Sequence, residues 1–143
     1  VSASCATAGQ TPANGGDNAD AVVDAFLTAY MASDAARMLS LLAEDVYFED
    51  PTSHLLARGR DEVRRLVESM SRTYRDVRIT PINRISAGHW VVSQQRVAGA
   101  LVRPDKPARQ VDVQGVSIFE VDAGRIRRWY DYYDVLTFRE QTA

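Results

Sequence analysis

The stretch from residue 113 to residue 134, VQGVSIFEVDAGRIRRWYDYYD, constrains the fold most, because it predicts two long strands joined by a tight turn at 122–124. Successive side chains of a strand point to opposite faces, so Trp129, Asp131 and Tyr133 share one face. A carboxylate between two large aromatic side chains is costly to bury without a partner, and burial raises its pKa. We therefore expect Asp131 either to be neutralised by a cation or to be a tuned acid in a pocket.

Length and charge exclude several classes of function. The chain has 143 residues, enough for one domain with a real core. A net charge of −2 without a basic stripe disfavours nucleic acid as a partner, and no apolar run is long enough to span a membrane. A single cysteine, Cys5, excludes an intrachain disulfide, and no nucleotide or zinc spacing is present. We expect a cytoplasmic protein that needs no metal and no cofactor, and we leave export of the mature chain open.

The hydrophobic pattern divides the chain into an arm and one domain. Residues 1–16 are small and polar, and predict a disordered N-terminal arm or the remnant of an export signal. Residues 17–143 are expected to form a single domain. Apolar residues at helical spacing predict helices over about 17–33, 34–43 and 60–74. Alternation predicts strands over 45–50, 77–85 and 90–102, before the pair of strands in 113–134. Loops are predicted at 51–59 and 103–108, and a last short helix near 135–140.

Helices followed by a long meander of strands are typical of an α+β fold. We expect a curved antiparallel or mixed sheet, wrapped by three N-terminal helices, that encloses a cone with an apolar interior. The segment 103–108, RPDKPA, holds two prolines and is predicted to be a mobile loop that acts as a lid over the cone.

Alternation also predicts which polar side chains face the inside of the cone. It places Asp50, Arg96 and Asp131 there, as a candidate acid/base pair with a positioning cation. The predicted substrate-binding wall consists of Phe26, Leu27, Tyr30, Phe48, Gln94, Val113, Gly115, Ser117, Trp129 and Tyr133.

Each of the three charged residues also has a simpler interpretation. Asp50 precedes Pro51, and alternatively it only caps a turn. Arg96 is alternatively a surface residue of its strand. Asp131 is alternatively half of a structural ion pair with Arg96 that does no chemistry.

The segment GVSIFEVDAGRIRRWYDYYD resembles the C-terminal strands of limonene-epoxide hydrolases and SnoaL-like polyketide cyclases, which belong to the nuclear transport factor 2-like superfamily. The segment FLTAYMASDAARMLSLLAEDVYFEDP resembles both that group and the ketosteroid isomerases. Together the two resemblances cover nearly everything after residue 17. They imply the cone-shaped α+β fold and, by analogy, a homodimer.

The resemblance to the hydrolases and cyclases is partial at the site residues. It implies that Asp131 is the general acid of the hydrolases, or the acid/base aspartate of the cyclases. Arg96 matches the hydrolase arginine that bridges two aspartates, but Ala98 stands where the second aspartate is expected. Phe48 and Asp50 stand where the hydrolases hold the attacking water with a tyrosine and an asparagine.

The resemblance to the ketosteroid isomerases is partial as well. It implies that Asp50 is a general base. The tyrosine and the protonated aspartate of the isomerase oxyanion hole correspond to Phe26 and to a position near Ser117.

Three functions follow from these residues. The first is a cofactor-independent cyclase or isomerase that acts on an apolar, polyketide-like small molecule by positioning and acid/base catalysis. The second is an epoxide hydrolase or epoxide-opening cyclase with Asp50 as base. The third is a module that binds an apolar ligand without changing it, with Asp131 and Arg96 as a buried structural pair.

Overall fold

The computed structural model describes residues 16–143, so residues 1–15 of the predicted arm lie outside the described residues. The elements follow in the order α1 (Gly16–Met31), α2 (Ala35–Ser40), β1 (Leu42–Asp50), β2 (Leu55–Arg58), α3 (Gly59–Thr73), β3 (Tyr74–Ala87), β4 (Trp90–Arg103), β5 (Lys106–Asp122), β6 (Arg125–Tyr133) and α4 (Val135–Thr142). No helix in this part of the chain has the length and apolar character needed to cross a membrane.

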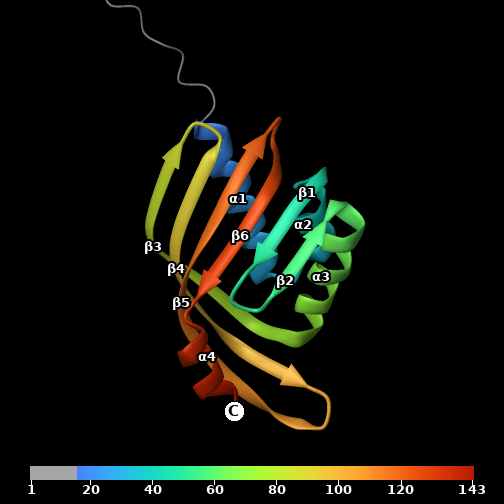
Figure 1. The fold of residues 1–143 in the computed structure, drawn as a ribbon, viewed down its shortest axis with the longest axis vertical. Coiled ribbons are helices and arrows are strands. Elements are labelled where there is room, and N and C mark those ends of the chain that lie inside the picture. Colours follow the sequence, from blue (N-terminus) through green and yellow to red (C-terminus); the bar gives the residue numbers. More distant parts are fainter. Residues whose placement is uncertain (1–15) are drawn as a thin grey trace, which may run out of the picture.

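The strands form one curved sheet in the order β2-β1-β6-β5-β4-β3. Strands β1 and β6 run parallel, and the other neighbouring pairs are antiparallel. Figure 1 shows α1 running behind the strands and α3 beside β2. Helix α1 packs against β3, β4, β5 and β6, whereas α3 packs mainly against β1. The predicted α+β class, with a curved mixed sheet and three N-terminal helices, is confirmed.

The short N-terminal helices begin and end where local side-chain chemistry allows. The Asp34 carboxylate caps α2 by accepting a hydrogen bond from the backbone N–H of Arg37 at 2.9 Å. Helix α3 carries Asp61 and Glu62 in its first turn and Arg72 in its last, which complements the helix dipole.

Two segments predicted as loops are strands instead. Residues 55–58, inside the predicted loop 51–59, form β2 and pair with β1. The segment 103–108 is mostly strand, because β4 runs to Arg103 and β5 begins at Lys106. The turn between them has Asp105 at a φ of 60°, a left-handed conformation that Asp tolerates better than most residues. The prediction of a loop over this whole segment is therefore wrong, whereas a lid made from it stays a prediction.

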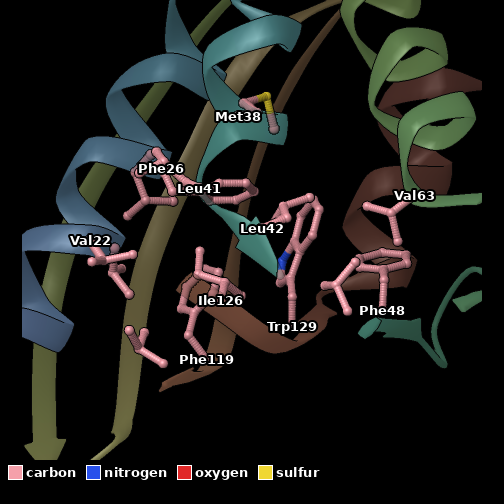
Figure 2. Packing of buried hydrophobic residues seen from close by; sticks show 14 of the residues in the cluster. Val22, Phe26, Met38, Leu41, Leu42, Phe48, Val63, Phe119, Ile126 and Trp129 are labelled. Carbon is pink, nitrogen blue, oxygen red and sulfur yellow. The ribbon is translucent and has the colours of Figure 1, made fainter. Parts of the chain in front are cut away.

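An aromatic cluster fills the space between the helices and the concave face of the sheet. Figure 2 shows Trp129 at its centre, between Phe26 and Phe48. The centroid of the Trp129 ring lies 5.0 Å from that of Phe26 and 4.4 Å from that of Phe48, both in edge-to-face geometry. Such pairs contribute about 0.5–1.5 kcal/mol each beyond the area that they bury. The cluster therefore fixes Trp129, and with it the strand that carries Asp131 two residues further on.

Candidate active site

A cavity of about 180 Å³ opens beside this core, between the concave face of the sheet and helices α1, α3 and α4. Both predicted carboxylates, Asp50 and Asp131, are part of its wall. The wall also contains every predicted wall residue except Gln94: Phe26, Leu27, Tyr30, Phe48, Val113, Gly115, Ser117, Trp129 and Tyr133. Most of the other side chains around the cavity are apolar, so it offers a largely apolar binding site with a few polar groups.

Asp131 presents one carboxylate oxygen to the protein and leaves the other unbonded. Its Oδ1 accepts hydrogen bonds from Ser117 Oγ at 2.6 Å and from Trp129 Nε1 at 2.8 Å. Its Oδ2 has no hydrogen-bond partner among residues 16–143. Burial raises the pKa of the Asp131 carboxyl from 3.8 to about 6, with a smaller contribution from the charge of Asp50, whereas the two hydrogen bonds lower it. This carboxyl can therefore hold or release a proton near neutral pH, as a general acid requires.

Asp50 is the second carboxylate of the cavity, with 6% of its surface exposed. Strands β1 and β6 pair in parallel with Phe48 opposite Trp129, so alternation places Asp50 beside Asp131 on the same face. The Oδ1 of Asp50 accepts hydrogen bonds from the Thr52 hydroxyl and, at 3.0 Å, from the backbone N–H of Ser53. Asp50 thus caps the turn with one oxygen while it also borders the cavity.

The charges around the cavity are all of one sign. No lysine, arginine or histidine borders it within the described chain. Burial, together with the charge of Asp131, raises the pKa of Tyr30, so its hydroxyl stays protonated and can donate a hydrogen bond at neutral pH. Burial raises the pKa of Tyr74 as well. An anion that entered the cavity would meet two carboxylates and no counter-charge, whereas a neutral carbonyl oxygen would meet hydrogen-bond donors.

The prediction that Arg96 and Gln94 face the inside of the cone is wrong. The Arg96 side chain is 60% exposed, and its Nε donates a hydrogen bond to Asp112 Oδ1 at 2.6 Å on the outer face of the sheet. Gln94 accepts a hydrogen bond from Asn83 Nδ2 at 2.8 Å, also away from the cavity. Neither the Arg96 bridge between two carboxylates nor the Arg96–Asp131 structural pair exists in this structure.

The residues of β4 that do face inward are Ser93 and Gln95, which the sequence analysis did not identify. A bulge near the β4–β5 hairpin, between Leu101 and Arg103, shifts the register. The extra residue lies on β5, so alternation along β4 itself stays regular from its buried end at Leu101 to Val91, and only a count carried across the hairpin from β5 assigns the wrong face to β4. The usable signal was the charge of Arg96, which indicates that even-numbered positions of this strand face solvent.

Gly115 is the position where β5 and β6 approach most closely beside the site. A Cβ atom built there would lie 2.5 Å from the carbonyl oxygen of Tyr132 and 3.1 Å from the Cβ of Tyr133. Any side chain would therefore push the two strands apart. Gly115 itself borders the cavity, two residues before Ser117.

Comparisons with known proteins agree with the fold. The family model described as SnoaL-like domain matches residues 23–129. Epoxide hydrolase EphG of Mycobacterium tuberculosis (strain ATCC 25618 / H37Rv) is 30% identical over 113 residues, which cover 79% of this chain and 71% of that protein.

Similar solved structures include proposed polyketide cyclases and an epoxide hydrolase. A proposed polyketide cyclase from Pseudomonas putida KT2440 has a TM-score of 0.77 at 26% identity, over 87% of this chain and 98% of that one. An LEH-like epoxide hydrolase from M. tuberculosis has a TM-score of 0.74 at 25% identity, over 88% of this chain and 90% of that one. The chain therefore belongs to the SnoaL-like domain family, whose fold is that of the nuclear transport factor 2-like proteins.

Proposed function

We propose that this protein is a cofactor-independent cyclase or isomerase that acts on a small, neutral, apolar molecule of polyketide-like character. The observation that carries the proposal is the state of Asp131: its Oδ1 is held by two donors, its Oδ2 is unbonded, and the carboxyl borders an apolar cavity beside a second carboxylate. Two carboxyl groups with different surroundings can serve as acid and base at the same time.

The two carboxyl groups divide the chemistry of a ring closure of the aldol type. Ionised Asp50 removes a proton from the carbon next to a carbonyl, and that carbon forms a bond to a second carbonyl carbon. The oxygen of the second carbonyl takes the proton of Asp131, so Asp50 ends protonated and Asp131 ionised. Exchange with water through the cavity restores both groups. In an isomerase the same Asp50 returns its proton to another carbon of the substrate.

The apolar wall supplies the other part of the rate enhancement. A flexible chain that is folded against Trp129 and Tyr133 has its reacting carbons held together, which replaces an unfavourable entropy of encounter. The Tyr30 hydroxyl, which stays protonated and borders the cavity, would stabilise negative charge that develops on the substrate oxygen.

A second candidate function is epoxide hydrolysis, which the identity with EphG favours. Asp131 would then protonate the epoxide oxygen, and Asp50 would activate the attacking water. Turnover of a simple terpene epoxide and of a flexible diketone, in water enriched in oxygen-18, distinguishes a hydrolase from a cyclase or isomerase. A hydrolase produces a diol with one labelled oxygen, whereas our proposal expects ring closure or isomerisation without labelled diol. Recovery of both compounds unchanged despite tight binding would support a non-catalytic module instead.

The cavity is expected to discriminate strongly against anions. Cyclohexyl methyl ketone and cyclohexanecarboxylate have similar shapes but differ in charge. Two carboxylates without a counter-charge are expected to weaken binding of the carboxylate by about tenfold or more at pH 8, measured by calorimetry. Asp50→Asn removes one of the two charges, so the difference is expected to narrow in that variant. Equal affinity of the unmodified protein for the two ligands would contradict this account of the site.

A further inference from the structure

Three buried polar side chains form a hydrogen-bonded row that ends at Asp131. Ser93 Oγ donates to Gln95 Oε1 at 3.1 Å, Gln95 Nε2 donates to Ser117 Oγ at 2.9 Å, and Ser117 Oγ donates to Asp131 Oδ1 at 2.6 Å. Ser93, Gln95 and Ser117 are each at most 5% exposed. They stand on the adjacent strands β4 and β5, where Ser93 pairs with Ser117 across the ladder. Buried polar groups on an otherwise apolar face are costly unless every one is satisfied, as these are.

Trp129 fixes the direction of this row. The indole Nε1–H can only donate, and it donates to Asp131 Oδ1, so that oxygen is an acceptor in every protonation state. When Oδ1 carries no proton, the Ser117 hydroxyl also donates to it, and a lone pair of Ser117 Oγ accepts from Gln95 Nε2. A proton on Oδ1 would displace the hydrogen that Ser117 donates to it, so the proton of Asp131 is favoured on Oδ2, the oxygen without a partner among the described residues.

The row has no outlet at its far end. Ser93 is fully buried, with 0% of its surface exposed, and it contacts no charged group through the hydrogen bonds of the described chain. No proton can leave Asp131 along the row into solvent. Proton exchange is therefore expected on the side of Asp131 that borders the cavity, through Oδ2.

We propose that Gln95 is a positioning residue for Asp131, acting through Ser117. Its amide orients the Ser117 hydroxyl toward Oδ1, which stabilises the ionised carboxylate and directs the proton to the oxygen that faces substrate. Gln95 donates to the reacting carboxyl only by way of Ser117, since its own Nε2 contact is to the serine. The effect of Gln95 on turnover rests on the proposed function. Its effect on the Asp131 carboxyl does not, because that effect is present without substrate.

Few other titratable groups act on Asp131. Asp50 of β1 and Tyr30 of α1 face it, and Tyr74 of β3, Tyr132 and Tyr133 of β6 border the same cavity. Burial raises the pKa of Tyr30 and of Tyr74, so both hydroxyls stay protonated, and Asp50 is the further carboxyl group to consider. It is unchanged in every variant below.

The test is an NMR titration of the Asp131 side-chain carboxyl in the full chain, without substrate. In Gln95→Met the amide donor is lost and the Ser117 hydroxyl is free to turn away, so the ionised form loses stabilisation. The inflection is expected to move to higher pH by about 0.5–1 relative to the unmodified protein. Ser117→Ala is expected to move it in the same direction by about 1 or more.

The double variant separates a positioning role from a merely structural one. If Gln95 acts through Ser117, Gln95→Met adds no further change in the Ser117→Ala background. The matched control is Gln94→Met, the same substitution on the neighbouring residue, which lies on the outer face. It is expected to leave the titration of Asp131 unchanged.

Two results would overturn the proposal: a titration of Asp131 in Gln95→Met that coincides with that of the unmodified protein, or an equal effect of Gln95→Met with and without Ser117. Should Gln95→Met fail to fold, Ser93→Ala tests the same step, because it releases the Oε1 end of the amide. A titration unaltered in Ser93→Ala and in Ser117→Ala would then reject the row as a unit. A protein that catalyses no ring closure but shows these displacements would reject the proposed function and retain the role of Gln95.

Discussion

Asp131→Asn is expected to lower kcat/KM by about 10²–10⁴-fold on any substrate that the unmodified protein turns over, because an amide cannot transfer the proton. The fold is expected to remain intact, since the amide oxygen can still accept from Ser117 and Trp129. The matched control is Asp112→Asn, which removes a carboxylate on the outer face of the sheet and is expected to leave turnover unchanged. Turnover of Asp131→Asn within a few-fold of the unmodified protein would remove Asp131 as the proton carrier.

The same substitution is expected to make the protein more stable above pH 6. The pKa of Asp131 is about 6 in the folded protein and 3.8 as its ordinary value, so the folded state binds this proton more tightly. Stability therefore falls as pH rises from about 4 to 6, and the full cost is present above that range, at up to about 3 kcal/mol. Asp131→Asn does not ionise and avoids this cost. Urea unfolding at pH 8 and at pH 4 checks the sign: the gain is expected at pH 8 and should shrink at pH 4.

A loss of stability at pH 8 in Asp131→Asn would indicate that the carboxylate is a structural anchor. The combination of lower activity with higher stability is the signature of a residue held for function at the expense of the fold.

Phe26→Ala is expected to destabilise the protein by about 3–5 kcal/mol, the usual range for deleting a buried phenylalanine. Phe26 is fully buried and packs edge-to-face against Trp129 and Phe119, with centroid distances of 5.0 Å and 5.9 Å. The control is Ile85→Ala on the outer face, where 67% of the residue is exposed and the expected loss is within about 0.5 kcal/mol. Urea unfolding of both variants measures the difference. Equal losses for the two would mean that the aromatic cluster is not the core that supports Asp131.

Much of the fold was predictable because the relevant patterns are local. The alternation around Trp129 and Asp131 identifies the inner face of β6, and Val46 and Phe48 do the same for β1. In both strands the inward residues are large and apolar or aromatic, so the pattern indicates clearly which face is buried.

The prediction of the inner face of β4 was wrong for the opposite reason. Its inner face is polar at Ser93 and Gln95, its outer face carries Gln94 and Arg96, and Val91 and Val92 give no preference at its start. Hydrophobic alternation cannot choose between two such faces. The choice is made by the long-range packing of the strand, which buries Val91 and Leu101 on the same face as Gln95.

The same explanation covers the site. Asp50 and Asp131 were identified because each carboxylate stands among apolar residues of its own strand. The hydrogen-bonded row behind Asp131 was not identified, because its residues are ordinary polar side chains. They contact one another only when β4 and β5 are aligned. A one-residue bulge near the hairpin sets that alignment, and bulges leave little trace in a single sequence.

The most direct test of the account is the titration of the Asp131 carboxyl in the unmodified protein, followed by NMR of its side-chain carbon from pH 3 to pH 9. The account predicts an inflection near pH 6, because the carboxyl is buried in an apolar cavity beside Asp50. It also predicts a decline in kcat/KM above the same pH, as the acid form is lost. An inflection near pH 4, as for an ordinary solvent-exposed aspartate, would contradict the claim that this residue is a tuned acid.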